Sequence, residues 1–193
     1  MKTVNFIAME DGTAEEYALL DRYEYQYKAG LSERLIDAVL RLENSLKGYK
    51  VTVLEHSLQS ATRAYRAGES EEWVVAALLH DIGDDLAVYS HSELVAAILK
   101  PFVSEEVYWV VKHHGIFQMY YYAHHRGSDQ NARDRYKDNP HYDATVRFCH
   151  EYDQNCFDPE YPSEPIDFFR PMMERVFAEP RHGYEEMETA YCE

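Results

Sequence analysis

The sequence predicts an all-α protein that forms one domain over residues 1–193, a helical bundle with its core in about residues 30–178. Apolar residues recur at helical spacing along nearly the whole chain. The alternation of Val, Ile and Thr between turn dipeptides that marks strands is almost absent. A chain of 193 residues can bury a core large enough to fold without disulfides or structural zinc.

Two helices are expected before residue 50. The first covers residues 14–28. Ser32 is predicted to cap the second, which runs to about Lys47, where Gly48 supplies a left-handed stop.

Two further helices form the centre of the predicted bundle. Apolar positions from Leu54 onward share one helix face, and Gly68 ends that segment. Ser70 then opens a helix over residues 71–81, in which residues 73–79 are apolar all round. Because a helix without a polar face is buried on every side, we expect this one to be central.

In the second half of the chain, two further helices and an irregular segment are predicted. A helix that begins near residue 90 ends before Pro101, and another runs from Ser104 to His114, where Gly115 is expected to stop it. Residues 116–139 combine aromatic, His and Arg side chains and are interpreted as an irregular excursion with a functional role.

The C-terminal part contains two more predicted helices. One covers residues 141–155, and Pro165 is the expected first residue of the other. Residues 181–193 are acidic and small, and a loose tail is expected there.

Charge and cysteine content exclude several classes of protein. Lys and Arg number 19 and Asp and Glu number 35, so the net charge of −16 repels a phosphate backbone, and nucleic acid is not an expected partner. The three cysteines match no Cys-x-x-Cys zinc pattern and are interpreted as reduced thiols of a cytoplasmic protein. No apolar run is long enough to span a membrane, and no secretory leader is visible, so no membrane partner is expected.

Six side chains at or near the ends of these helices form a candidate metal site. They are His56, His80, Asp81, His91, His114 and Asp153. Consecutive helical side chains diverge by about 100°, so His80 and Asp81 can share one centre only across the end of their helix. The two oxygens of Asp81 can bridge two cations while the other ligands distribute around them. Imidazole and carboxylate donors without thiolate indicate iron or manganese rather than magnesium.

The motifs around these ligands resemble those of the HD-domain superfamily. Residues 55–59 (EHSLQ) and 77–83 (ALLHDIG) are similar to its first two motifs. His91, residues 112–115 (KHHG) and residues 151–159 (EYDQNCFDP) resemble the remaining ligand motifs of its mixed-valent di-iron oxygenases. That branch includes oxygenases of myo-inositol and of 2-amino-1-hydroxyethylphosphonate, and the oxygenases of the trimethylammonium phosphonate look closest in character. The resemblance covers roughly residues 30–178.

The resemblance implies a fold, a cofactor and a ligand set. It implies an HD-domain helical bundle with a central dinuclear site of two iron ions, Fe(II) and Fe(III), and no organic cofactor. The six side chains named above would be the ligands, with Asp81 bridging. His113 is the rival of His114 for one place, and His114 is preferred because Gly115 follows it.

The resemblance also implies a substrate class. The expected substrates are O2 and an anionic or zwitterionic hydroxyphosphonate, whose carbon–phosphorus bond is cleaved to release phosphate and an amino acid or betaine, with glycine betaine favoured. Asp84 stands where the relatives carry a basic residue, so other donors must hold the phosphonate and Asp84 could face a cationic substrate end. The candidate substrate-binding residues are Asp84, Gln118, Tyr121, Arg126 and Arg133, and the candidate lid residue is Tyr49.

Two other functions stay open from the sequence. An HD-type phosphohydrolase would use the same ligands with Mn(II) or Ni(II) to hydrolyse a phosphate ester. A catalytically silent binding module would use the aromatic residues of 116–139 to hold a ligand or a partner. The oxygenase is favoured because a full dinuclear ligand set accompanies the motif at residues 151–159. Formation of a homo-oligomer also stays open.

Overall fold

The fold is entirely helical, which confirms the predicted class. The computed structural model describes residues 1–181, and these residues form eight α-helices and no strand. The helices are α1 (Ala14–Ala29), α2 (Leu31–Arg41), α3 (Val53–Arg66), α4 (Glu71–Leu79), α5 (His91–Leu99), α6 (Glu105–Tyr122), α7 (Tyr142–Phe148) and α8 (Ile166–Val176). Short 3-10 turns are η1 (Met9–Asp11), η2 (Leu42–Asn44), η3 (Ala123–Arg126) and η4 (Ala132–Tyr136), and η5 (Cys149–Asp153) is a π-helical turn.

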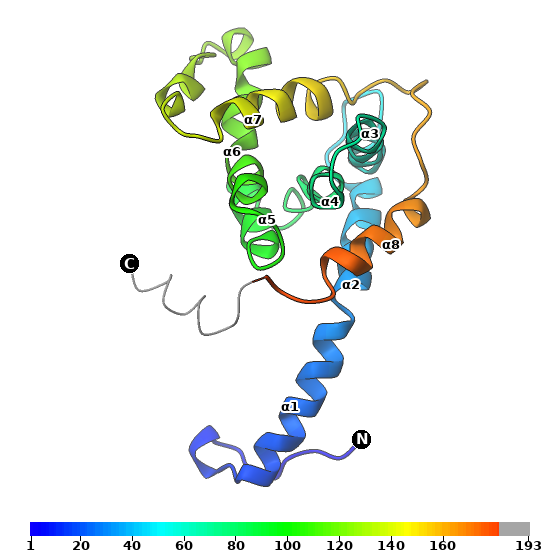
Figure 1. The fold of residues 1–193 in the computed structure, drawn as a ribbon, viewed down its shortest axis with the longest axis vertical. Helices are drawn as coiled ribbons and strands as arrows, with labels where there is room; N and C mark the ends of the chain where they lie inside the picture. Colours follow the sequence, from blue (N-terminus) through cyan, green and yellow to red (C-terminus); the bar gives the residue numbers. More distant parts are fainter. Residues whose placement is uncertain (182–193) are drawn as a thin grey trace.

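Helix α4 lies at the centre of the molecule, as its sequence predicts. Every residue from Trp73 to Leu79 is buried. Helix α3 runs beside α4, and α2, α6 and α8 also pack against it (Figure 1). The C-terminal end of α4, where His80 follows, is therefore enclosed by other helices on several sides.

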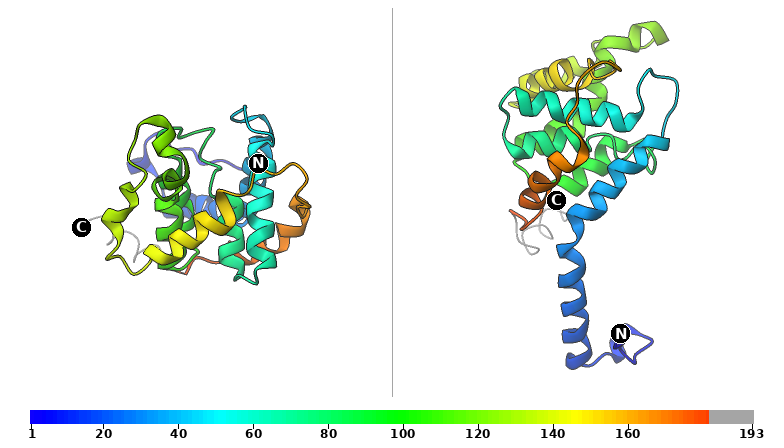
Figure 2. Two further views of the ribbon diagram at one scale, coloured as in Figure 1. Left: turned by 90° about the horizontal axis from the view of Figure 1, so that it is seen from above. Right: turned by 90° about the vertical axis from the view of Figure 1, so that its right-hand side faces the viewer.

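Helices α5, α6 and α7 form the other half of the body. Helix α5 packs along α6, and α7 packs against the C-terminal part of the fold's longest helix, α6 (Figures 1 and 2). Ser104 is the N-cap of helix α6, and its hydroxyl accepts a hydrogen bond from the Val107 backbone N–H at 3.4 Å. This arrangement brings the C-terminal end of α4, the N-terminal end of α5 and the middle of α6 to one region.

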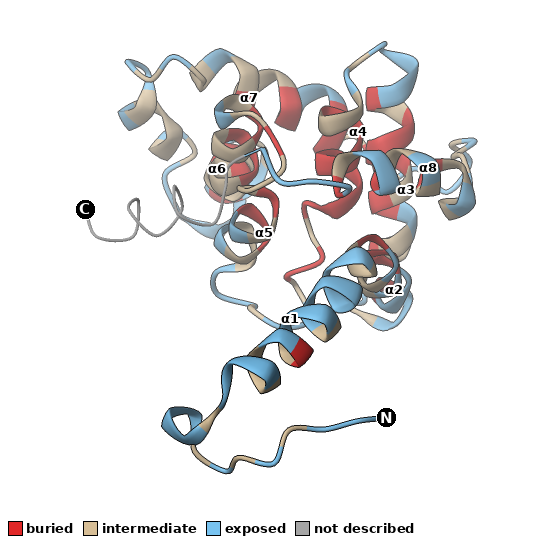
Figure 3. Ribbon diagram, turned by 60° about the horizontal axis from the view of Figure 1, so that its bottom comes forward, coloured by how far each residue is buried: buried red, intermediate tan, exposed pale blue. Residues whose placement is uncertain are grey.

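Helix α1 projects away from the body (Figures 1 and 2). Thr13 and Glu16 form a capping box at its start, which satisfies backbone donors that the first turn leaves free. The preceding chain folds back on the helix, where the Phe6 and Tyr17 rings stack with centroids 5.6 Å apart. Leu19 is the buried residue of α1, and most of the rest is exposed (Figure 3).

The predicted cap at Ser32 is wrong. Helix α2 begins at Leu31 with Gly30 as its N-cap, and Ser32 is buried inside the first turn without a capping hydrogen bond. The chain turns from α1 into α2 within one residue, so the glycine occupies the position that the serine was expected to take. Helix α2 also ends earlier than predicted, and Gly48, with φ +122°, lies in the loop beyond η2.

Gly115 does not stop a helix, because α6 continues through it to Tyr122. A Cβ at Gly115 would lie 3.0 Å from the Ser92 Oγ atom on α5. The glycine thus permits close packing of two helices, a role that only the folded structure shows. The first part of the predicted irregular excursion is consequently helical, and its remainder contains the turns η3 and η4.

The predicted helix over residues 141–155 divides into α7 and the π-helical turn η5. Pro165 is the N-cap of α8 rather than its first residue, and Pro171 lies inside that helix. Arg181 donates its backbone N–H to the Pro101 carbonyl at 2.7 Å, so this residue is held against the body. The rest of the predicted tail, residues 182–193, lies outside the described residues. Within residues 1–181, no helix has both the length and the apolar character that crossing a membrane requires.

Candidate metal centre

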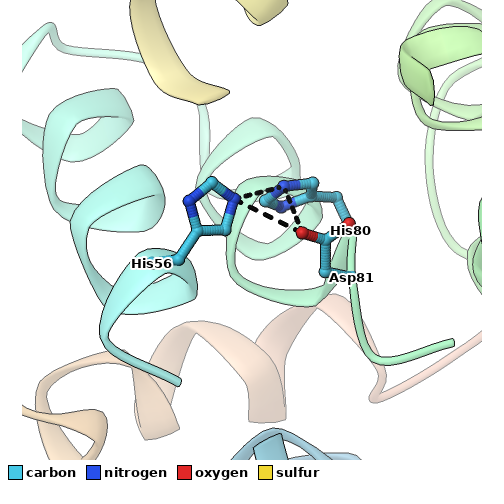
Figure 4. A group of neighbouring side chains, drawn as sticks. All are labelled: His56, His80 and Asp81. Carbon is cyan, nitrogen blue, oxygen red and sulfur yellow. Dashed lines mark hydrogen bonds and ion pairs between the residues drawn. The ribbon is translucent and has the colours of Figure 1, made fainter. Parts of the chain in front are cut away.

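The end of α4 places His80 and Asp81 opposite His56 of α3 (Figure 4). The Nε2 atoms of His56 and His80 are 3.1 Å apart. Each lies 3.3 Å from the Oδ2 atom of Asp81. Asp153, from η5, adds its Oδ1 atom at 3.5 Å from His56 Nε2 and 3.8 Å from His80 Nε2. Two imidazoles and two carboxylates therefore surround one point, which we call the first position.

The other oxygen of Asp81 faces a second pair of histidines. Its Oδ1 atom lies 3.4 Å from His114 Nε2 and 3.7 Å from His91 Nε2. These two Nε2 atoms are 3.2 Å apart. Three side chains thus surround a second position, and a single carboxylate faces both positions with different oxygens.

Three of the four imidazoles are held by hydrogen bonds at their Nδ1 atoms, and the fourth, His91, by an ion-pair contact. Nδ1 of His80 lies 2.7 Å from the Ala77 carbonyl oxygen, and Nδ1 of His114 lies 2.6 Å from that of Val111. Carbonyl oxygens only accept hydrogen bonds, so these Nδ1 atoms donate and the Nε2 atoms keep free lone pairs. Nδ1 of His56 lies 3.1 Å from the Cys156 carbonyl oxygen. Nδ1 of His91 lies 3.4 Å from the Asp84 Oδ1 atom.

These contacts fit a metal centre. Two Nε2 lone pairs 3.1–3.2 Å apart repel each other, and a cation between them would satisfy both members of each pair. The Oδ2 atom of Asp153 is buried without a hydrogen-bond partner, which is costly for a carboxylate that no cation approaches. The donors are nitrogen and carboxylate oxygen, a set that suits iron, manganese and related ions.

The electrostatic environment of the cluster also favours a cation. Burial lowers the pKa of His80, but the carboxylates of Asp81 and Asp153 outweigh it and raise that pKa to about 10. Burial raises the pKa of Asp81, but His80 and the other imidazoles lower it well below its usual value. Positive charge is therefore strongly stabilised between these side chains.

A cavity of about 490 Å³ borders both positions. This volume is in the range of small-molecule sites. His91, His114, His56 and both metal-facing aspartates border the cavity, whereas His80 lies behind them and is fully buried. The other lining residues are Leu46, Tyr49, Thr52, Val53, Asp84, Gly115, Gln118, Tyr121, Tyr122, Arg126, Gln154 and Phe157.

Comparison with known proteins gives the family. The model of the HD domain matches residues 53–151, the segment from the start of α3 to η5. The chain belongs to the HD-domain family. The match begins just before His56 and includes five of the six candidate ligands, with Asp153 two residues beyond its end.

One curated relative has a named activity. It is the [1-hydroxy-2-(trimethylamino)ethyl]phosphonate dioxygenase (glycine-betaine-forming) of Leisingera caerulea, with 38% identity over 78 residues. The match covers 35% of this chain and 40% of the relative. The HD-domain chain is thus similar to less than half of the length of that enzyme.

Four of the five predicted substrate-binding residues lie at the cavity. Asp84, Gln118, Tyr121 and Arg126 line it. Asp84 contacts His91, and Gln118 donates from Nε2 to Asp153 Oδ1 at 2.8 Å. These two side chains thus also orient candidate ligands, a role that the sequence did not indicate.

Arg133 is not among the residues that line the cavity, contrary to its predicted role. Its guanidinium carbon lies 3.7 Å from the centroid of the Tyr120 ring. The 3-10 turn η4, which carries Arg133, packs on α6, the helix that carries Tyr120. The ring face favours the guanidinium, while its Nε and one Nη atom are buried without a hydrogen-bond partner.

His113 and His114 have different surroundings in the HD domain. His113 stacks on Trp109 with centroids 3.9 Å apart and bonds the Trp109 carbonyl through Nδ1. It belongs to an aromatic cluster with Tyr136, and His114 is the residue that faces Asp81.

Tyr49, the candidate lid, lies at the exposed edge of the cavity. Its ring contacts Phe157 with centroids 4.8 Å apart, and Phe157 stacks on His56 at 4.5 Å. Phe157 was not predicted as a site residue, although it lies in the motif at residues 151–159. An aromatic side chain in that motif was the signal available, but its contact with a residue about a hundred positions earlier depends on the tertiary fold.

Proposed function

We propose that this chain is a di-iron, O2-dependent oxygenase that cleaves the carbon–phosphorus bond of a 1-hydroxy-2-(trimethylamino)ethylphosphonate-type substrate. The products would be phosphate and an amino acid or betaine, with glycine betaine favoured. One observation carries the proposal: the two oxygens of Asp81 face two separate histidine pairs beside a cavity of about 490 Å³. The named activity of the partial relative supports the substrate class.

The proposed ligands divide between two cations. His56, His80, Asp153 and one oxygen of Asp81 would hold the first, and His91, His114 and the other oxygen of Asp81 would hold the second. A mixed-valent iron pair, Fe(II) and Fe(III), would supply the redox chemistry with O2, so no organic cofactor is required. Four imidazoles are neutral ligands, and therefore two carboxylates leave the pair with surplus positive charge for an anionic substrate.

The second position is the more open side of the centre. It has three protein donors, whereas the first has four. His91 keeps 27% of its side-chain surface exposed, while His80 keeps none. Substrate oxygens entering from the cavity therefore meet the His91 and His114 side.

The cavity wall offers groups for both ends of a zwitterionic substrate. Arg126 at the edge is a cation that can pair with the phosphonate. The Oε1 atom of Gln118 is buried without a hydrogen-bond partner and can accept a hydrogen bond from a substrate hydroxyl or a bound water. Asp84 with the rings of Tyr121 and Phe157 can face the quaternary ammonium.

The overall reaction fixes what must be measured. A hydroxyphosphonate and one O2 give one carboxylate, one hydrogen phosphate and one proton, so O2 uptake and phosphate release occur in equal amounts. Purified protein would be assayed for iron content, for a mixed-valent electron paramagnetic resonance signal that changes on substrate addition, and for phosphate by phosphorus NMR. Hydrolysis of phosphate esters with Mn(II) and no O2 uptake would instead indicate the HD-type phosphohydrolase.

Adjacent histidines supply a matched pair of variants. His114→Ala should abolish O2 uptake because it removes a ligand at the second position. His113→Ala should leave the iron content and turnover close to those of the unmodified chain, since its ring contacts Trp109 rather than the centre. Equal losses in the two variants would contradict the proposed ligand set.

A further inference from the structure

A row of α3 side chains holds the main chain of residues 155–164. This segment connects η5 to α8 without regular secondary structure and passes beside α3 (Figure 1). The contacts run from His56 to the Cys156 carbonyl, from Gln59 to Asp158, from Arg63 to the Asn155 carbonyl and from Arg66 to the Pro162 carbonyl. Their spacing of three or four residues places them on one face of the helix.

Gln59 makes the most complete of these contacts. It is 2% exposed, and both ends of its amide bind one residue. Nε2 donates to the Asp158 carbonyl oxygen at 2.8 Å, and Oε1 accepts from the Asp158 backbone N–H at 3.3 Å. A segment outside helices and sheets must satisfy its inner backbone groups in some other way. Gln59 satisfies the Asp158 N–H and shares the Asp158 carbonyl with the Tyr161 N–H, which donates to it at 3.1 Å.

The residues just before Asp158 hold His56. The Cys156 carbonyl oxygen lies 3.1 Å from His56 Nδ1. The Phe157 ring stacks on the His56 ring at 4.5 Å with an interplanar angle of 26°. Residues 156–158 are therefore fixed by Gln59 at one end and fix the His56 ring at the other.

We infer that Gln59 is a positioning residue for the first metal position, which keeps the His56 Nε2 atom directed at Asp81. The inference rests on the proposed metal centre. Loss of the Gln59 amide removes both hydrogen bonds that tie the Asp158 peptide to α3, so the Cys156 carbonyl and the Phe157 ring hold the His56 orientation less tightly. The second position is independent of this effect, because His91 and His114 are oriented by Asp84 and Val111.

The test is a titration of the full chain, stripped of metal, with Mn(II). The unmodified chain should take up two Mn(II) ions, whose electron paramagnetic resonance signal is broadened by coupling through the shared carboxylate. Gln59→Leu should bind Mn(II) at the first position about 10–100-fold more weakly, as for loss of an outer contact to a ligand. At intermediate Mn(II) it should therefore show one ion per chain with the six-line signal of an isolated Mn(II).

Thr62→Val is the matched control. Thr62 is also fully buried on α3, and its Oγ1 accepts from the Glu164 backbone N–H at 3.0 Å. It therefore tethers the same segment farther from His56. Its substitution should lower the unfolding temperature but keep two coupled ions.

Gln59→Glu covers the case in which Gln59→Leu does not fold. Its ionised carboxylate can accept from the Asp158 N–H but cannot donate to the Asp158 carbonyl, so weakened binding at the first position alone is expected. Two ions bound with unchanged affinity in the folded Gln59 variants would overturn the inference, as would equal weakening at both positions. An unmodified chain that binds no metal would overturn the proposed function instead.

Discussion

At the scale of single residues, Asp81 has the largest predicted effect. Its two oxygens face different histidine pairs, so one substitution removes a ligand from both positions. Asp81→Ala is expected to reduce the metal content from two ions per chain to nearly none, measured by elemental analysis after desalting. Asp153→Ala is the comparison, because it removes a donor from the first position and should spare the second. Two retained ions in Asp81→Ala would contradict the shared carboxylate.

Gly83 is the residue whose substitution most directly disturbs His91. A Cβ there would lie 2.7 Å from the His91 carbonyl oxygen and 2.8 Å from its Cα atom. Both are backbone atoms, so Gly83→Ala must displace the start of α5. We expect a loss of about 1–3 kcal/mol in unfolding free energy, with weaker binding at the second position, measured by urea denaturation and Mn(II) titration.

Gly115→Ala is the control for Gly83→Ala. Its Cβ would meet the Ser92 Oγ atom at 3.0 Å, and that hydroxyl can rotate away. Alanine also favours a helix interior by about 1 kcal/mol over glycine. The net change in stability should therefore be small, and a loss as large as that of Gly83→Ala would show that α5 and α6 tolerate no added methyl group.

At the scale of elements, periodicity predicted the helices better than their ends. The apolar run of α4 and the spacing in α3 are local patterns, and both helices lie where expected. Ser32 was misjudged because Gly30 takes the N-cap position in the one-residue turn from α1. Gly115 was misjudged because α6 continues through it in close contact with α5. The π-helical turn η5 was not predicted, since the extra residue that it accommodates leaves no mark in the spacing of apolar side chains.

In the candidate site too, local patterns predicted some features, and the tertiary fold determined the others. The six proposed ligands could be selected because His and Asp at helix ends beside apolar faces are unusual residues to bury. Their outer partners could not be selected: the Cys156 carbonyl, the Gln118 amide and the Phe157 ring lie 35 to 101 positions from the side chains that they contact. Such pairings depend on how the helices pack, which no local pattern of this sequence encodes.

The turn η5 is tied to the start of α4 by Tyr152. Its hydroxyl donates to Glu69 Oε1 at 2.7 Å, and Arg147 pairs with the same carboxylate. Tyr152 is 2% exposed, so Tyr152→Phe should lower the unfolding free energy by about 1 kcal/mol, measured by the urea midpoint. A double-mutant cycle with Glu69→Gln should be non-additive, and strict additivity would argue against the tie.

At the scale of the whole molecule, the proposed centre joins α3, α4, α5, α6 and η5. Metal bound only by the folded state stabilises it by about 2.7 kcal/mol per site when its concentration is 100 times the dissociation constant. For a chain of this size that corresponds to roughly 5–10 °C per site. Thermal unfolding with chelator and then with added Fe(II) or Mn(II) should show this difference. A double variant, His56→Ala with His114→Ala, should respond to neither treatment.

The proposed ligands are dispersed from residue 56 to residue 153, and this order has a consequence for biosynthesis. A ribosome releases His56, His80 and Asp81 first, a trio whose donor atoms fall within 4.8 Å of one another in the finished fold. His91 and His114 follow, and Asp153 emerges last. All three side chains of the second position, Asp81, His91 and His114, are therefore synthesised before Asp153 completes the ligand set of the first.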